Sequence, residues 1–228
     1  MPDKQPENLL EALPKNVRSG LLAHKYTVKY EPGAQILRQD ENTQDVFYIN
    51  YGKVRVTFYT EKGDRLSFTE MYTGQSFGEL SAIDLQPRTA NVVAIEETSL
   101  TRIRHAQFRS LLRTYPDFAH FIMCQMTALI RRLNARMYEL RALDARHRIY
   151  AELLRMAETG ENENGRAIIN NPPTHSEIAA RINSHREAVS RTCRALIREG
   201  LLEKPSKQLI LTDPPALQER IDSCFERK

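Results

Sequence analysis

Hydrophobic and polar positions alternate with a period of two from about Tyr26 to Ile103, in short runs separated by turns that contain glycine or proline. Short strands with a turn about every ten residues predict an antiparallel β-sandwich or barrel. The predicted strands lie at residues 26–28, 35–37, 46–49, 54–58, 66–68, 91–94 and 99–103. A small barrel of this kind can hold one small ligand in its interior.

On both sides of this region the apolar positions recur with a helical period. Residues 3–23 carry a helical pattern that Pro14 interrupts, so we expect two short helices there. After a short helix that ends before Pro116, Phe118 to Leu143 runs without proline or glycine. Its apolar seam comprises Ile122, Met126, Leu129, Leu133 and Leu140. A long helix with such a seam is buried or pairs with a copy of itself, and we favour a parallel two-stranded dimer.

The last third of the chain predicts a helix-turn-helix with a β-hairpin behind it. Asp144 is expected to cap a helix from Ala145 to Thr159, and a short strand is expected at 168–169. Residues 174–177 (Thr-His-Ser-Glu) and 184–187 (Ser-His-Arg-Glu) each match a capping box that opens a helix. Gly200 ends the second helix, and residues 202–204 and 208–211 then predict a two-stranded wing.

The second of these helices is amphipathic. Its predicted buried stripe is Val189, Cys193, Leu196 and Ile197, and its polar face holds Arg186, Glu187, Ser190, Arg191 and Arg194. Arginine can donate to guanine and glutamate can accept from cytosine, so this face predicts sequence-specific contact with double-stranded DNA. The simpler alternative is a solvated helix on which Glu187 serves only as a cap.

Length, net charge and hydropathy limit the number of domains and the kinds of partner that this protein can have. The chain has 228 residues and a formal net charge of +4, with a pI near 9.0 and a mean hydropathy of −0.53. One large or two small domains fit this length, and the basic balance makes nucleic acid a reasonable partner. The N-terminus shows no signal peptide, and no run is apolar and long enough to span a bilayer.

Metal and enzyme chemistry are not indicated. The three cysteines, Cys124, Cys193 and Cys224, are scattered without C-x-x-C spacing, so we expect neither disulfides nor zinc, and a reducing cytoplasm as the location. A cupin-like metal enzyme would need clustered histidines, but His24 is the only histidine in the β region. No nucleophile–base pair is visible either, so the protein is not expected to be an enzyme.

The stretch from Phe77 to Val92, FGELSAIDLQPRTANV, interrupts the strands and carries the candidate ligand chemistry. Gly78 allows backbone amides at the start of a short helical turn to approach an anion. Arg88 can bind phosphate oxygens with two parallel hydrogen bonds, and Thr89 adds a hydroxyl beside it. Glu79 only accepts hydrogen bonds, which suits a ribose hydroxyl. A surface turn beside an ordinary arginine is the simpler alternative.

The pattern G-E-L, a short helix and then R-[ST]-A resembles the phosphate-binding cassette of cyclic-nucleotide-binding domains. Together with the strands, the long helix, Asp144 and the winged helix-turn-helix, it resembles the Crp-Fnr family of bacterial transcription regulators over nearly the whole chain. The resemblance implies an α+β fold in three parts. These are an N-terminal antiparallel β-roll of the cyclic-nucleotide-binding type (1–115), a dimerisation helix (116–143) and a winged helix-turn-helix DNA-binding domain (144–228).

The resemblance also implies which residues form the sites. The cyclic-nucleotide site would comprise Gly78, Glu79, Leu80, Ser81, Arg88, Thr89 and Asn134. The DNA contacts would come from Thr174, Ser176, His185, Arg186, Glu187, Ser190 and Arg191. Among these, Arg186, Glu187 and Arg191 would read a TGTGA-like half-site. The implied partners are double-stranded DNA, a second copy of the chain and RNA polymerase, with no membrane, no metal and no Fe–S cluster.

The purine end of the ligand site departs from the family pattern. A cyclic-AMP-binding member presents threonine and serine from its central helix, whereas Leu133 and Asn134 stand there in this chain. Leu133 cannot donate to adenine, but Asn134 can donate and accept and therefore suits adenine or guanine. We favour cyclic AMP, with cyclic GMP as its rival. An Arg88→Ala variant is expected to lose the ligand response and keep its fold.

Two other functions remain open on the sequence alone. One is a DNA-binding regulator of the same family that needs no nucleotide. The other is a cyclic-nucleotide-binding regulatory subunit that controls a protein partner.

Overall fold

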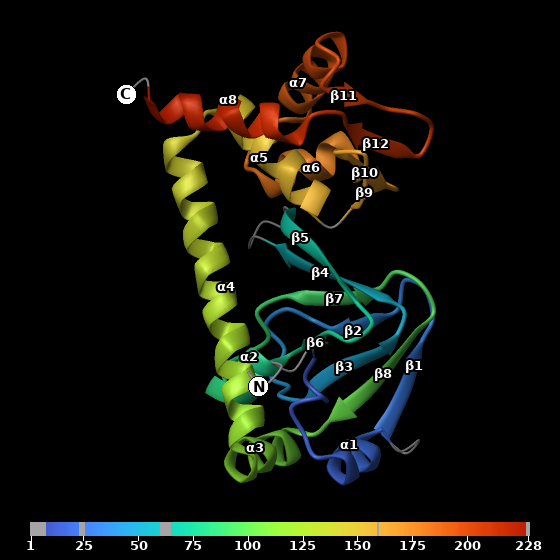
Figure 1. Ribbon diagram of the computed structural model, residues 1–228. Coiled ribbons are helices and arrows are strands. Elements are labelled where there is room, and N and C mark those ends of the chain that lie inside the picture. The colour runs from blue at the N-terminus through green and yellow to red at the C-terminus, as the bar shows by residue number, and fades with distance from the viewer. Residues whose placement is uncertain (1–7, 23–25, 60–64, 159, 227–228) are drawn as a thin grey trace. The chain divides into compact units, whose positions relative to one another are not determined.

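The computed structural model describes residues 8–22, 26–59, 65–158 and 160–226. It divides into two compact units, residues 1–130 and 131–228, each with its own elements (Figure 1). The division falls within the long helix α4 (Pro116–Ala142), which matches the helix expected from the sequence. The three-part division at residues 115 and 143 stays a prediction, and His24 lies outside the described residues.

The first unit is built on two four-stranded antiparallel sheets with the orders β1-β8-β3-β6 and β2-β7-β4-β5. The strands are β1 (Thr27–Tyr30), β2 (Gln35–Leu37), β3 (Val46–Tyr51), β4 (Lys53–Tyr59), β5 (Arg65–Tyr72), β6 (Ser76–Phe77), β7 (Asn91–Ala94) and β8 (Thr98–Ile103). All seven predicted strands are present. Only β6 was missed, because two residues carry no detectable period. The apolar side chains of both sheets share one core, in which Phe47 and Phe77 stack with ring centroids 5.4 Å apart.

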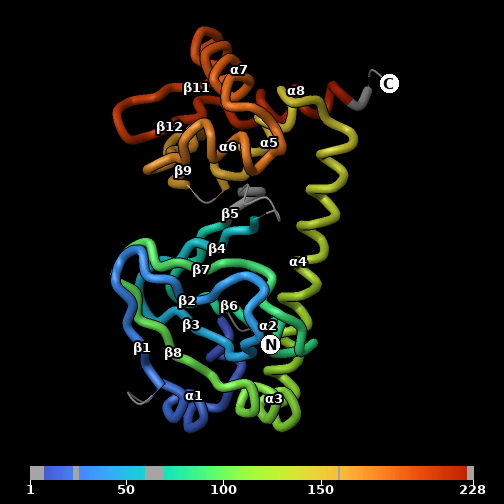
Figure 2. Tube along the Cα trace, turned by 180° about the vertical axis from the view of Figure 1, so that it is seen from behind, coloured from blue at the N-terminus to red at the C-terminus, as the bar shows by residue number. Residues whose placement is uncertain are grey.

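Helices cover one side of this β-roll. They are α1 (Lys15–Leu21), α2 (Glu79–Asp84), α3 (His105–Thr114) and the first turns of α4 (Figure 2). Their buried side chains share a second apolar cluster. The expectation of two helices before residue 23 is wrong for the described part, because residues 8–13 form turns and Pro14 then begins α1. Phe118, Phe121 and Ile122 of α4 are buried in this cluster, so Ile122 does not belong to the exposed seam of that helix.

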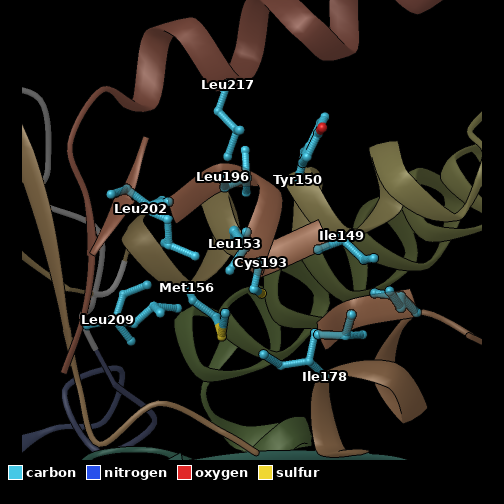
Figure 3. Packing of buried hydrophobic residues seen from close by; sticks show 14 of the residues in the cluster. Ile149, Tyr150, Leu153, Met156, Ile178, Cys193, Leu196, Leu202, Leu209 and Leu217 are labelled. Atoms are coloured by element: carbon cyan, nitrogen blue, oxygen red, sulfur yellow. The ribbon is translucent and has the colours of Figure 1, made fainter. Parts of the chain in front are cut away.

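The second unit contains α5 (Ala145–Glu158), α6 (His175–Arg181), α7 (Arg186–Arg198) and α8 (Pro214–Glu226). Its sheet has the order β11-β12-β10-β9, with strands at Leu202–Glu203, Gln208–Leu211, Arg166–Asn170 and Glu161–Glu163 respectively. Residues from all four helices and from the sheet converge on one core, shown in Figure 3. The predicted wing is β11–β12.

The strand expected at residues 168–169 is present as β10, but the sequence analysis missed β9 and the helix α8. We expected a turn or exposed loop at residues 161–165, and Asn164 and Gly165 do make a tight turn, with φ of 52° and 80°, but residues 161–163 before it pair with β10 as a strand. An Asn-Gly turn of this kind is a strong hairpin signal. Over the described ranges, none of the helices has the length and apolar character needed to cross a membrane.

Candidate functional site

Gly78 places the candidate cassette against the β-roll. It precedes α2 with a φ of 90°, a conformation that favours glycine. A Cβ atom at this position would lie 2.8 Å from Nη1 of Arg88 and 2.8 Å from the carbonyl oxygen of Asp45. We expected the missing side chain to leave room for a ligand, but the guanidinium of Arg88 occupies that room.

Arg88 is buried, with 2% of its surface exposed. It donates from Nε to Oγ1 of Thr43 (2.9 Å), from Nη1 to the carbonyl oxygen of Gly78 (2.8 Å) and from Nη2 to that of Asp45 (2.6 Å). These bonds use three of the five N–H groups of a guanidinium, and every acceptor is neutral. In the described part of the chain no carboxylate forms an ion pair with Arg88, and the carboxylates near it act on its charge only from a greater distance.

The surroundings of Arg88 explain its electrostatics. Burial lowers the pKa of its guanidinium, and the nearby carboxylates of Asp45, Glu41 and Glu79 oppose that shift. An Arg88→Ala variant would leave buried acceptors without a donor, each at a cost of about 1–3 kcal/mol. We expected this variant to keep its fold and lose the ligand response, and the structure adds that its fold would be less stable.

Glu79 supplies the complementary group. Its Oε2 atom is buried and has no hydrogen-bond partner in the described part of the chain. Burial raises the pKa of its carboxyl, while its own backbone N–H and the charge of Arg88 oppose the shift. An unused acceptor beside two unused N–H groups of Arg88 fits an anion that also carries a hydroxyl, as a ribose cyclic phosphate does.

The other predicted ligand residues differ in their placement. Ser81 is buried, and its hydroxyl donates to the carbonyl oxygen of Pro87 at 3.3 Å, so it closes the cassette loop. Leu80 is half-buried at the start of α2, and Thr89 is exposed next to Arg88. Asn134 is exposed on the part of α4 that belongs to the second unit, and its contact with a purine stays a prediction.

The sequence analysis missed Thr43 and Asp45. The carbonyl oxygen of Asp45 accepts from Arg88, and its carboxylate accepts from Nε of Arg102 (2.6 Å) and from the backbone N–H of His105 (2.9 Å). No periodic or motif signal marks a residue that acts through its backbone carbonyl. Among the described residues, no group of three or more His, Cys, Asp or Glu side chains is arranged to hold a metal ion.

The first capping box of the helix-turn-helix is confirmed. Oγ1 of Thr174 accepts from the backbone N–H of Glu177 at 3.2 Å. In return, the carboxylate of Glu177 accepts from the backbone N–H of Thr174 at 2.9 Å. Ser176 is exposed in the first turn of α6. Bonds of this kind fix the N-terminus of α6, which offers its remaining backbone N–H groups to an anion.

The second capping box is wrong. The N-cap of α7 is His185, which makes no side-chain capping bond, so Ser184 lies one residue too early for that role. Glu187 is therefore the second residue of the helix rather than the third, where a capping box needs its glutamate. Its exposed carboxylate is not part of a capping box, and the simpler interpretation left for this residue is a solvated position.

The exposed face of α7 is the one predicted, with one correction on the buried face. Val189, Thr192, Cys193 and Leu196 are buried, whereas Ile197 is 43% exposed because it lies near the end of the helix. The side chains of His185, Arg186, Glu187, Arg191 and Arg194 are exposed, and Ser190 is half-buried.

This face carries several exposed arginines, and their charges extend to α6. The pKa of His175 is lowered by its burial and then by the charges of Lys204, Arg186 and Arg194, which come from the wing and from α7. Cations from these elements thus act together at the first helix of the motif. Such a surface attracts the phosphates of DNA, and the exposed side chains of α7 can then reach base edges.

The exposed face of α4 is a third candidate surface. Its apolar side chains recur every seven residues in two rows, Met123, Ile130 and Met137, and Met126, Leu133 and Leu140. All are exposed except the half-buried Met126. This is the a/d pattern of a two-stranded coiled coil. It differs from the predicted seam at Ile122, which is buried in the first unit, while the half-buried Leu129 stays a predicted seam residue.

Comparison with known proteins agrees with both predicted domain types. Residues 27–115 match the cyclic nucleotide-binding domain, and residues 147–220 match the Crp-like helix-turn-helix domain. The Cyclic AMP receptor protein of Thermus thermophilus is 28% identical over 173 residues, which are 76% of this chain and 77% of that protein. The CRP-like cAMP-activated global transcriptional regulator of Mycobacterium tuberculosis is 25% identical over 194 residues, 85% of this chain and 87% of that one.

A solved structure of a CRP/FNR family transcriptional regulator, also from Thermus thermophilus, superposes with a TM-score of 0.64 at 25% identity. It covers 86% of this chain and 98% of that chain. The fold of this chain is thus shared with that regulator over most of both chains. The chain belongs to the Crp-Fnr family of transcription regulators, which bind DNA and are not enzymes, and it carries the cyclic-nucleotide-binding domain of that family.

Proposed function

We propose that the protein is a homodimeric transcription regulator whose affinity for a palindromic TGTGA-like DNA site is controlled by a cyclic nucleotide. The observation that carries the ligand is the buried guanidinium of Arg88, which has only neutral acceptors and lies beside the unpartnered carboxylate oxygen of Glu79. A cyclic phosphate would supply the missing anion, and the ribose hydroxyl would donate to Glu79. Gly78, Leu80, Ser81 and Thr89 complete the cassette around it.

We favour cyclic AMP as the ligand. Two relatives, from Thermus thermophilus and Mycobacterium tuberculosis, carry cyclic AMP in their names. Cyclic GMP remains the rival because Leu133 and Asn134 stand where a cyclic-AMP-binding member has threonine and serine. The amide of Asn134 can hydrogen-bond to either purine, so the two nucleotides must be compared directly.

The two copies would pair through the exposed a/d rows of α4. A parallel pairing makes the dimer two-fold symmetric, and a symmetric dimer with two recognition helices binds two half-sites about one DNA turn apart. The half-site contacts would come from Arg186, Glu187 and Arg191, with Thr174, Ser176, His185 and Ser190 at the backbone and flanks. In the cytoplasm, RNA polymerase is the partner we expect for the DNA-bound dimer.

Fluorescence anisotropy of a labelled TGTGA–spacer–TCACA duplex tests this function at one fixed salt concentration, because DNA affinity depends steeply on salt. The titration is run without ligand, with cyclic AMP and with cyclic GMP, and each is repeated with a scrambled duplex. Tighter binding with one nucleotide identifies the effector. Tighter binding with both means that the cassette reads ribose and phosphate alone. Equal affinity for the scrambled duplex contradicts the proposed half-site.

A ligand-independent regulator is the second candidate, and one observation favours it. Arg88 is 2% exposed and donates to Thr43, Gly78 and Asp45 without any anion, so the cassette is closed around neutral protein acceptors. Isothermal titration calorimetry with each nucleotide separates the two functions. Absence of binding heat, together with tight binding of the TGTGA duplex, would favour this second function.

A further inference from the structure

Glu152 of α5 is a buried carboxylate on which three helices converge. Only 2% of its side chain is exposed. Its Oε2 atom accepts from Nη1 of Arg136 in α4 at 2.9 Å and from Nη1 of Arg155 in α5, and its Oε1 atom accepts from Nη1 of Arg181 in α6 at 3.3 Å. One side chain therefore joins the last turns of the long helix to the first helix of the helix-turn-helix.

A second carboxylate extends the network along α4. Glu139 accepts from Nη2 of Arg155 at 2.5 Å, and it lies 3.8 Å from Nη1 of Arg136. Charge-assisted hydrogen bonds of this kind are directional, unlike the apolar contacts around them. A buried carboxylate whose two oxygens are both bound also holds its partners in one geometry, because leaving it unpaired is costly.

This network lies on the turns of α4 that also carry the proposed dimer contacts. The same turns that carry Arg136 and Glu139 carry Leu133, Met137 and Leu140 of the a/d rows. A change in how two copies of α4 pair would move these turns as a rigid piece. Because Arg136 is bonded to Glu152, a shift of Arg136 would displace Glu152, and with it Arg181 of α6, which is bonded to the same carboxylate.

We propose that Glu152 is the positioning residue through which the last turns of α4 set the placement of α6, and with it the DNA-reading face. This inference rests on the proposed function in one respect, which is that α6 and α7 bind DNA. It adds the physical link between the dimerisation helix α4 and the helix-turn-helix of α6 and α7. Neither the cassette nor the base-reading residues take part in it.

The test substitutes Arg136, because Arg136→Met removes the direct bond from Glu152 to α4 and leaves the Arg155–Glu139 pair in place. Glu152 keeps Arg155 and Arg181 as partners, and methionine keeps much of the apolar stem, so the fold is expected to survive. The control is Arg141→Met, an exposed position five residues further along α4 that also flanks the a/d rows. Sedimentation equilibrium first checks that both variants have the oligomeric state of the wild type.

Hydrogen exchange of the full-length, ligand-free protein is the primary measurement. Arg136→Met should increase amide exchange in α6 and in residues 136–142, while Arg141→Met should not. Affinity for the TGTGA duplex should fall about 2- to 30-fold in Arg136→Met relative to the control, the range in which residues of a coupling network act. A Glu152→Gln variant, if it folds, should reproduce both changes.

The outcomes separate this inference from the proposed function. Unchanged exchange in α6 of Arg136→Met overturns the role of Glu152, whatever the ligand does. A wild-type protein that ignores both nucleotides contradicts ligand control, whereas the exchange data still decide the role of Glu152. Increased exchange of α6 with unchanged DNA affinity would also overturn the inference, because the placement of α6 would then not matter for reading DNA.

Discussion

The guanidinium of Arg88 lies where a side chain at Gly78 would be, and its Nη1 donates to the carbonyl oxygen of Gly78 at 2.8 Å. Gly78, at the start of the cassette motif, and Arg88, near its end, are therefore in direct contact. Glycine is required there both by its positive φ and by the approach of the arginine. A ligand phosphate would have to meet an arginine that the protein has already positioned.

This contact predicts that Gly78→Ala is more costly than an ordinary glycine substitution. The backbone conformation alone costs about 1–2 kcal/mol for an L-residue, and the new Cβ would also clash with Arg88 and with the backbone of Asp45. Gly74→Ala is the matched control, because Gly74 has the same φ of 90° and no atom within 4 Å of its added Cβ. Urea unfolding should show a larger loss for Gly78→Ala, and equal losses would contradict the clash.

Glu79 predicts a dependence of stability on pH. Burial raises the pKa of its carboxyl above the ordinary value of 4.5, so above that pH the folded state binds more protons than the unfolded state. The free energy of unfolding must then fall as the pH rises through the folded-state pKa. Glu79→Gln should remove this fall, whereas Glu97→Gln, at an exposed position, should keep it. The measurement is urea unfolding at a series of pH values.

The same Glu79→Gln variant should bind cyclic nucleotide more weakly. A hydrogen bond to a charged group contributes about 1.5–3 kcal/mol, which corresponds to a loss of about tenfold or more in affinity. Calorimetric titration of both Glu79→Gln and Glu97→Gln measures this loss. Wild-type affinity in Glu79→Gln would show that the carboxylate does not hold the ribose.

The a/d rows of α4 predict which substitutions separate the dimer. Leu133→Glu places a charge in the proposed seam and should shift the protein towards the monomer, because two like charges would be buried together. Arg132→Glu is the control. It changes the charge by two units rather than one, but Arg132 lies outside the a/d rows, so the dimer should stay intact. Sedimentation equilibrium distinguishes them, and a dimeric Leu133→Glu protein would mean that another surface pairs the copies.

The recognition helix predicts a loss of sequence selectivity. Arg186→Ala should cost about 1–3 kcal/mol at one base pair of the half-site and relax the choice of base there. Arg198→Ala, at the exposed C-terminal end of the same helix, should affect all sequences alike or none. Anisotropy with duplexes substituted one base pair at a time provides the comparison. An equal loss on every duplex for Arg186→Ala would make Arg186 a phosphate contact.

Most helices and strands of this protein could be predicted from the sequence, because their signals lie in short stretches of the chain. Period-two alternation marked seven strands, the absence of proline and glycine marked α4, and the Thr174–Glu177 pair marked the start of α6. Each of these signals depends on residues within a few positions of one another. The cassette was also visible, because its glycine and arginine lie ten positions apart in one segment.

Only the tertiary structure decided the rest. Thr43 and Asp45 reach Arg88 across more than forty residues, and Arg181 reaches Glu152 across 29. Helical periodicity could not tell that Ile122 faces the β-roll while Met123 faces outward, because both fall on apolar stripes of one helix. Contacts between distant segments depend on how the elements pack, and buried charges such as Arg88 and Glu152 acquire their partners only through that packing.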